Sequence, residues 1–308
     1  MQAIKIVLGA PRPREGMPLQ HNAVIAEILK RKLGERLRRE VTVEYLTHEW
    51  EAAIVAPQYV ARSEPDGNTL LLDYHAPTIN AALGKLALEG LAPIMQLAIK
   101  RWVFAVTPSV PANSLDELVA YTHANPGRIK FTAFHNGAHG QLVIEEFKRK
   151  TGADLRFEPA GALADGISFA AASVDAIASG KVTLGTVLIE MALPLIRAGK
   201  LKPLAVTGPD RSFFMPQTPT VTEAGVPDAN ISVWTGLWAP VGTPQEIIAK
   251  LNRELTEIMQ LPQTKAAMES HGFESAPSTT EQFAALIETD VARWKELIRI
   301  AGIRPEDV

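Results

Sequence analysis

Residues 197–225 read RAGKLKPLAVTGPDRSFFMPQTPTVTEAG, and this stretch decides the fold. A helical pattern ends at Arg197, and Gly199 stands where a residue of left-handed conformation commonly terminates a helix. Residues 201–207 then alternate apolar and branched side chains, as a buried strand does. Three prolines exclude regular structure from the loop that follows: Pro209, Pro216 and Pro219. The stretch predicts a helix, a strand, a loop and a short helical turn in succession.

The composition is that of a globular protein long enough for two domains. The chain has 308 residues, of which 46% are hydrophobic and 21% charged, and its net charge is −3. This charge gives no bulk attraction to nucleic acid or to an anionic membrane. The absence of cysteine excludes disulfides and thiolate chemistry. The longest weakly charged apolar run, 182–196, contains Glu190 and Pro194 and is too short to span a bilayer.

Strands and helices are expected to alternate along most of the chain. Short apolar runs typical of strands occupy 4–8, 41–45, 69–73, 128–133 and 153–157. Between the first two, Ile25, Ile28, Leu29, Leu33 and Leu37 recur at helical spacing. The opposite face of that helix carries Lys30, Arg31, Arg38 and Arg39, which we interpret as a solvated face rather than an anion-binding patch. The alternation predicts an α/β fold with largely parallel sheets.

Three capping boxes are expected to start helices. They lie at Ser114–Glu117, Thr243–Glu246 and Ser278–Glu281. In each, a hydroxyl oxygen accepts from a backbone N–H three residues later, and the glutamate reaches back to the start. The second box also has proline at the first helical position, which suits a helix start.

Three segments carry a resemblance to a known family. Residues 197–225 are similar to the signature segment of the tripartite tricarboxylate transporter receptors of TctC or Bug type, in the order AGKL, LAVTG, PTV and EAG. The segment PDGNTLLL at 65–72 resembles a second family segment. Residues 107–131, TPSVPANSLDELVAYTHANPGRIKF, resemble a third. The likeness extends to the capped helical tail, and so covers most of the chain.

The resemblance implies the fold of a type II periplasmic binding protein. Such a protein has two α/β lobes joined by two crossing segments, with a ligand cleft between the lobes. The crossings are expected near 99–106 and 226–233. Lobe 1 would comprise residues 1–101 and 226–308, and lobe 2 residues 102–225.

The resemblance also implies a function. Members of the family are extracytoplasmic receptors that capture a small organic acid by lobe closure and deliver it to membrane permease subunits. We accordingly expect a monomer without cofactor, metal or catalytic residues, which neither binds nucleic acid nor inserts into a membrane. The sequence starts MQAIKIVLG, with no leader pattern before the first strand. We expect a mature periplasmic chain that carries a start methionine, with a cytosolic protein as the alternative.

The candidate ligand-binding residues lie in loops at strand ends and helix starts. A carboxylate needs hydrogen-bond donors without a bulky charge, and backbone N–H groups at helix N-termini supply them. The helix dipole adds roughly 0.3–1 kcal/mol at each such end. The residues are Gly9, Ala10, Arg12, Tyr74, His75, Ala76, Phe134, His135, Asn136, Gly137, Ala138, His139, Pro159, Ala160, Gly161 and Thr186.

The same loops depart from the family pattern. The family has a GG-x-x-D pattern where this chain has Leu-Gln-His-Asn-Ala at 19–23, and VPYKG where it has Phe-Glu-Pro-Ala-Gly at 157–161. An aspartate-bearing loop is replaced around Thr186 and Val187, and a histidine that begins a helix is Gln141 here. The sequence therefore predicts the scaffold and leaves the ligand open.

These loops also contain residues that suit other chemistry. His135 and His139 have the i, i+4 spacing of a helical metal pair, but a glycine separates them and no acidic third ligand is near, so hydrogen bonding or loop packing is expected. Arg12 and Arg14 could pair with an anion or form a solvated loop. Glu158 would repel a second carboxylate or recognise an amine or a hydroxyl.

Two alternative functions follow from the same sequence. One is a sensor on the same fold that signals ligand occupancy to a partner protein. The other is an enzyme that uses His135, His139 and Glu158. No Ser–His–Asp spacing, P-loop or nucleotide fingerprint supports catalysis.

Overall fold

The computed structural model describes residues 2–9, 22–46, 52–133, 138–158 and 169–307. The chain divides into two compact units. The first unit comprises residues 1–99 and 234–295, and the second comprises 100–233 and 296–308. The lobe limits that the resemblance implies stay a prediction, and each unit is described by itself below.

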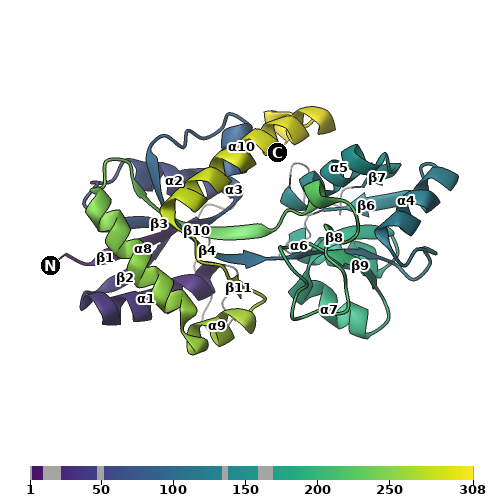
Figure 1. Ribbon diagram of the computed structural model, residues 1–308. Helices are drawn as coiled ribbons and strands as arrows, with labels where there is room; N and C mark the ends of the chain where they lie inside the picture. The colour runs from purple at the N-terminus through teal and green to yellow at the C-terminus, as the bar shows by residue number, and fades with distance from the viewer. Residues whose placement is uncertain (1, 10–21, 47–51, 134–137, 159–168, 308) are drawn as a thin grey trace. The chain divides into compact units, whose positions relative to one another are not determined.

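The first unit is built on a six-stranded sheet with strand order β11-β4-β10-β3-β1-β2. β1 is parallel to β2 and β3, whereas β10 is antiparallel to β3 and β11 is antiparallel to β4. Figure 1 shows helices on both faces of this sheet. The strands are β1 (Ile4–Leu8), β2 (Val41–Tyr45), β3 (Thr69–Tyr74), β4 (Leu91–Lys100), β10 (Val233–Pro240) and β11 (Glu274–Ser275). The helices are α1 (Asn22–Leu37), α2 (Ala52–Ala61), α3 (Ala76–Ala82), α8 (Gln245–Gln260), α9 (Pro262–Glu269) and α10 (Thr280–Ala301).

Alternation along the strands divides the core of the first unit into two layers. Ile6 and Leu72 point to the layer that α1, α8 and α9 cover, while Val7 and Leu71 point to the layer that contains α2 and α10. All five residues predicted on the apolar face of α1 lie in the first layer, four of them buried and Leu37 partly buried. The period-2 pattern of the strands thus fixes which helices each strand residue contacts.

The second unit has a five-stranded sheet with strand order β7-β6-β8-β5-β9. β6 is parallel to β7 and β8, while β5 lies antiparallel between β8 and β9. The strands are β5 (Trp102–Val106), β6 (Ile129–Thr132), β7 (Leu155–Phe157), β8 (Leu184–Leu188) and β9 (Lys202–Val206). The helices are α4 (Leu115–Ala124), α5 (His139–Thr151), α6 (Phe169–Ala178) and α7 (Ile189–Arg197), with short 3-10 turns η1 (Pro227–Ala229) and η2 (Pro305–Asp307).

β5 is the central element of the second unit, and all five of its residues are buried. Val103 and Ala105 pack in a cluster with residues of α6 and α7. Phe104 packs against Phe147 of α5, with ring centroids 5.4 Å apart and ring planes tilted by 55°. A strand covered on both faces reads as a continuous apolar run, as residues 102–106 do.

The stretch 197–225 forms the elements expected of it. α7 ends at Arg197, and Gly199 has a φ of 67°, the left-handed conformation that favours glycine. The strand β9 follows within 201–207. The turn at 220–225 starts with a reciprocal pair of bonds: Glu223 N–H donates to Thr220 Oγ1 at 3.0 Å, and Thr220 N–H donates to the Glu223 carboxylate at 2.7 Å. This pair is a capping box that the sequence analysis missed.

Of the three predicted capping boxes, the first forms with one difference: the Glu117 carboxylate accepts from the Asn113 N–H at 2.7 Å, one residue before Ser114. Ser114 Oγ accepts from Glu117 N–H at 3.1 Å. The third is displaced by one residue, because Thr279 and Gln282 make the reciprocal bonds. The second is wrong: α8 has no side-chain cap, and the Thr243 hydroxyl donates to the Pro240 carbonyl at 2.8 Å.

The side of β10 that faces α10 has room for no side chain at Gly236. A Cβ built there would lie 2.1 Å from Cζ of Phe283, whose ring packs between Trp234 and Trp238 with centroid separations of 5.2 and 5.1 Å. Close approach of another group is one of the physical reasons for glycine inside a strand.

We predict that Gly236→Ala lowers the free energy of unfolding by about 1–3 kcal/mol, because the Phe283 ring must leave its site. Chemical denaturation monitored by tryptophan fluorescence measures the change. Phe283→Leu makes room for the methyl group, so the double variant should lose less than the sum of the two single variants. A Gly236→Ala variant as stable as the wild type would contradict this packing.

Candidate functional site

The carboxyl end of β3 brings three polar side chains together in the first unit. Asp73 and His75 are buried, with 2% and 5% of their surfaces exposed, while Tyr74 between them is 37% exposed. Asp73 Oδ1 accepts a hydrogen bond from the Tyr74 N–H at 2.8 Å. The His75 ring lies edge-on to Tyr74 and to Trp234, at centroid distances of 5.1 and 6.5 Å.

The backbone after β3 is held by α10. The His75 carbonyl accepts from the Thr78 hydroxyl at 2.6 Å and from the Thr78 N–H at 3.0 Å. The same hydroxyl oxygen accepts from Trp294 Nε1–H of α10 at 3.0 Å. A residue more than 200 positions away therefore fixes the loop that carries Tyr74, His75 and Ala76.

Burial makes Asp73 and His75 neutral at pH 7. It raises the pKa of Asp73 to about 8, although the hydrogen bond from the Tyr74 N–H acts in the opposite direction. It lowers the pKa of His75 to about 3. The carboxyl end of β3 thus presents an uncharged acid and an uncharged imidazole.

The pKa of Asp73 has a consequence for stability. Its folded-state value lies above the ordinary value of 3.8, so the native state holds a proton that the unfolded state releases. The contribution of Asp73 to the free energy of unfolding is fully present below pH 4 and is lost as the pH rises toward 8. The loss amounts to at most about 4 kcal/mol at pH 7.

We predict that the melting temperature of Asp73→Asn relative to the wild type rises between pH 5 and pH 8. The amide keeps the acceptor for the Tyr74 N–H and has no proton to lose. Differential scanning calorimetry of both proteins across this pH range measures the difference between their melting temperatures. Asp116→Asn, which changes an exposed aspartate of α4, serves as the control. Parallel curves for Asp73→Asn and the wild type would show that Asp73 is ionised in the native protein.

The start of α5 is the corresponding polar place in the second unit. Trp102 Nε1–H donates to His139 Nδ1 at 2.8 Å, and the two rings stack at a centroid distance of 5.7 Å. An indole nitrogen only donates, so His139 Nδ1 is an acceptor and Nε2 carries the proton of the neutral ring. His139 is therefore fixed as a donor through Nε2.

Thr186 and Gly140 lie against each other beside this histidine. The Thr186 hydroxyl donates to the Gly140 carbonyl at 2.9 Å, and a Cβ at Gly140 would lie 2.9 Å from that hydroxyl. Ala138, the residue before α5, provides no side-chain cap. The hydroxyl proton of Thr186 is thus bonded within the protein. The backbone N–H groups in the first turn of α5 receive no hydrogen bond from the side chain of the cap residue.

The predicted site residues are distributed between the two units. Gly9, Tyr74, His75 and Ala76 belong to the first unit, and Ala138, His139 and Thr186 belong to the second. The others lie outside the described residues: Ala10, Arg12, Phe134, His135, Asn136, Gly137, Pro159, Ala160 and Gly161. The complete set stays a prediction, and so does the expectation that His135 and His139 serve hydrogen bonding or loop packing rather than metal binding.

The structure adds residues that the sequence did not single out. Trp102 and Trp234 contact the two predicted histidines, and Trp234 donates from Nε1 to Asp290 at 2.6 Å. The tryptophans themselves were the signal in the sequence. A buried indole N–H generally requires an acceptor, so each tryptophan indicates a polar partner nearby.

Several charged groups near the predicted loops are already paired within the protein. Lys100 pairs with Glu190 of α7, and Arg101 Nη2 lies 2.7 Å from the Asp210 carboxylate. Glu158 forms an ion pair with Lys130 at 3.2 Å. These contacts lower the charge that the residues would present to a ligand.

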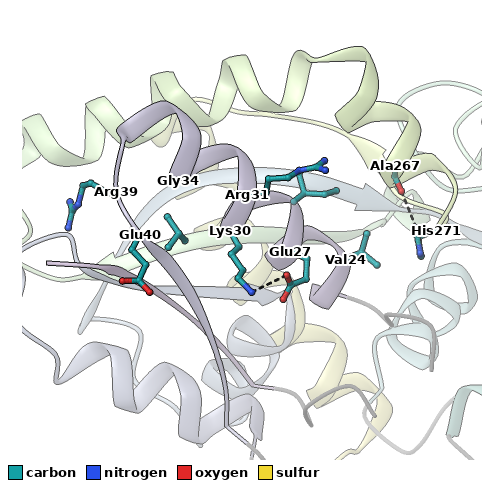
Figure 2. A pocket seen from close by; sticks show the side chains of 11 residues that line it. Val24, Glu27, Lys30, Arg31, Gly34, Arg39, Glu40, Ala267 and His271 are labelled. Carbon is teal, nitrogen blue, oxygen red and sulfur yellow. Dashed lines mark hydrogen bonds and ion pairs between the residues drawn. The ribbon is translucent and has the colours of Figure 1, made fainter. Parts of the chain in front are cut away.

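A shallow groove lies on the outer face of α1, between α1 and the end of α9 (Figure 2). Its cations are accompanied by acids: Lys30 lies 3.5 Å from Glu27, and Glu40 also lines the groove. Arg39 is bonded to the Gln2 carbonyl and the Asn68 side chain. The groove has the mixed charge of a solvated helix face, as the sequence predicts.

Comparison with known families identifies the scaffold. The family model described as tripartite tricarboxylate transporter family receptor, TctC, matches residues 25–303. The chain belongs to this family. The predicted membership is thereby confirmed.

Relatives of known sequence or structure agree over nearly the whole chain. Protein BugT of Bordetella pertussis is 28% identical over 287 residues, which cover 91% of this chain and 85% of BugT. The structure of a TctC solute-binding protein from Polaromonas, without ligand, has a TM-score of 0.82 at 22% identity and covers 97% of this chain and 98% of its own. An R. palustris protein solved with adipate has a TM-score of 0.74 at 24% identity, with 98% of both chains covered.

These structures confirm the predicted α/β fold of a periplasmic binding protein. A further member of this group is MatC of Rhodopseudomonas palustris with bound malate, with a TM-score of 0.68 at 22% identity and coverage of 96% of this chain and 99% of MatC. At these identities the structural likeness concerns the fold. The family itself consists of solute-binding receptors.

Proposed function

We propose that this protein is a solute-binding receptor that captures a small organic acid for a transporter of the tripartite tricarboxylate type. The observation that carries the proposal is the family match over residues 25–303. Relatives of the same fold have been solved with adipate and with malate, which are both dicarboxylates.

The chemistry of the described loops supports a carboxylate as ligand. His139 offers a donor through Nε2, because Trp102 occupies its other ring nitrogen. The first turn of α5 adds backbone N–H groups that no cap side chain covers. In the first unit, Asp73 and His75 are neutral at pH 7, so the carboxyl end of β3 does not repel an anion.

The rest of the proposal follows the family. The receptor works in the periplasm as a monomer, closes its lobes over the acid, and hands it to the membrane permease subunits without chemical conversion. It needs no cofactor. None of the helices that the structure describes could span a membrane.

A thermal-shift screen of mono- and dicarboxylates, amino acids and aromatic acids tests the function. An acid present at a hundred times its dissociation constant should add roughly 2.7 kcal/mol of stability. For a protein of this size that corresponds to a melting point higher by roughly 4 °C.

The matched control for each acid is its uncharged amide at the same concentration. The proposal predicts a shift with at least one acid and none with its amide. It fails if no organic anion raises the melting point, or if acid and amide raise it equally.

A further inference from the structure

Asp73 occupies an unusual place in the sheet of the first unit. It is the penultimate residue of β3, and its partner in the adjacent strand β10 is Gly236. β1 pairs with β3 so that Val7 lies opposite Leu71, and extending this register by two residues brings Gly9 opposite Asp73. Neither neighbouring strand therefore places a side chain beside the Asp73 carboxyl group.

One oxygen of this carboxyl group is not used by the protein. Oδ1 accepts from the Tyr74 N–H at 2.8 Å, whereas Oδ2 is buried and has no hydrogen-bond partner in the described part of the chain. Leaving a buried polar atom unpaired is costly, and such an atom in a native protein requires an explanation. A ligand atom that forms a hydrogen bond with Oδ2 would be such an explanation.

Apolar groups cover Asp73 from the side of α10, and its in-register neighbour in β1 is partly exposed. Phe283 fills the space above Gly236, between Trp234 and Trp238. Gly9, which the extended register places opposite Asp73, is partly exposed, while Asp73 itself is 2% exposed. Asp73 thus lies next to Gly9, a residue at the surface that the sequence predicts to bind the ligand.

No cation in the described elements packed against β3 lies against this carboxyl group. β10 and α3 contain no ionisable residue, and α2 contributes only Tyr59, which bonds Lys5 at 3.1 Å, toward the other end of β1. β1 itself contributes Lys5, which also pairs with Glu44. Among the charged residues of α10, Asp290 is buried, and it pairs with Arg293 at 3.5 Å. β3 itself adds Tyr74, and His75 follows it.

We propose that Asp73 binds the ligand directly as a neutral acid, donating a hydrogen bond from Oδ2 to a carboxylate oxygen of the organic acid. This inference rests on the proposed function and adds a specificity-determining residue to it. Burial favours the protonated form, which converts a group that would repel a carboxylate into a donor for it.

The donor role makes ligand affinity depend on pH in a defined direction. Binding requires the proton on Asp73, so affinity is full below the pKa of this group and falls as the pH rises above it. The fall should approach tenfold for each pH unit above the pKa of Asp73 in the free protein, and it should level off above the higher pKa of the liganded protein. His75, with a pKa of about 3, stays neutral throughout this range and does not contribute.

Isothermal titration calorimetry with adipate, and with the acid that gives the largest shift in the thermal screen, tests the proposal at pH 6.5 and 9.5. Asp73→Asn keeps a donor and an acceptor, so its affinity should remain within about threefold of the wild type at pH 6.5 and should not fall at pH 9.5. Asp73→Leu removes the donor and should bind about ten- to a hundredfold more weakly at pH 6.5. Asp116→Asn is the control and should follow the wild type.

The outcomes separate this inference from the proposed function. If acids bind the wild type and Asp73→Leu equally well, Asp73 is not a ligand group and the receptor function stands. If Asp73→Asn loses as much affinity as Asp73→Leu, the ligand binds to the ionised carboxylate, as a ligand with an ammonium group would. That result overturns the role of Asp73 as a neutral donor. If no acid binds the wild type, both fail. Melting curves identify variants that do not fold, and the pH dependence of the wild type then decides alone.

Discussion

The missing side chain at Gly236 is the constraint on which the functional end of the first unit depends. Because β10 is bare at this position, Phe283 reaches the sheet and packs between Trp234 and Trp238. This packing seats α10, and farther along the same helix Trp294 bonds Thr78, which holds the backbone of His75. The same aromatic layer lies beside Asp73 and keeps its carboxyl group out of water. One glycine therefore links the end of the chain to the chemistry at the end of β3.

In the second unit, the segment after β9 has a comparable structural role. Trp102 and Thr207 bond each other twice, from the Trp102 N–H to the Thr207 hydroxyl and from the Thr207 N–H to the Trp102 carbonyl, both at 2.9 Å. The next residue, Gly208, exchanges two bonds with the side chain of Asn230. Its φ of 125° and the Arg101 side chain, 2.3 Å from an ideal Cβ, leave room only for glycine. The Thr-Gly pair of the stretch 197–225 thus ties the strand that enters the unit to the segment that leaves it.

The sequence predicts the scaffold well because its signals are local. The apolar stripe of α1, the strand β9 and the glycine that ends α7 each depend on a few neighbouring residues, and each forms as expected. The capping boxes mark the limit of such reasoning. Thr243 has the right spacing but bonds the Pro240 carbonyl instead, since the chain enters α8 from a tight turn.

The chemistry of the candidate site depends on contacts between distant segments, so the sequence could not predict it. The tautomer of His139 is set by Trp102, 37 residues earlier. The neutral state of Asp73 follows from burial by residues more than 160 positions later, and only its place at a strand end was visible in the sequence. The family resemblance did not help at Thr186 or at the start of α5, because the chain departs from the family pattern at Thr186, Val187 and Gln141.

The most direct test of this account is a crystal structure of the protein with the organic acid that binds it most tightly. We predict a carboxylate oxygen of the acid about 2.5–2.7 Å from Asp73 Oδ2, the length of a hydrogen bond between a neutral acid and a carboxylate. An acid that is ordered in the crystal but out of hydrogen-bond reach of Asp73 Oδ2 would contradict the account.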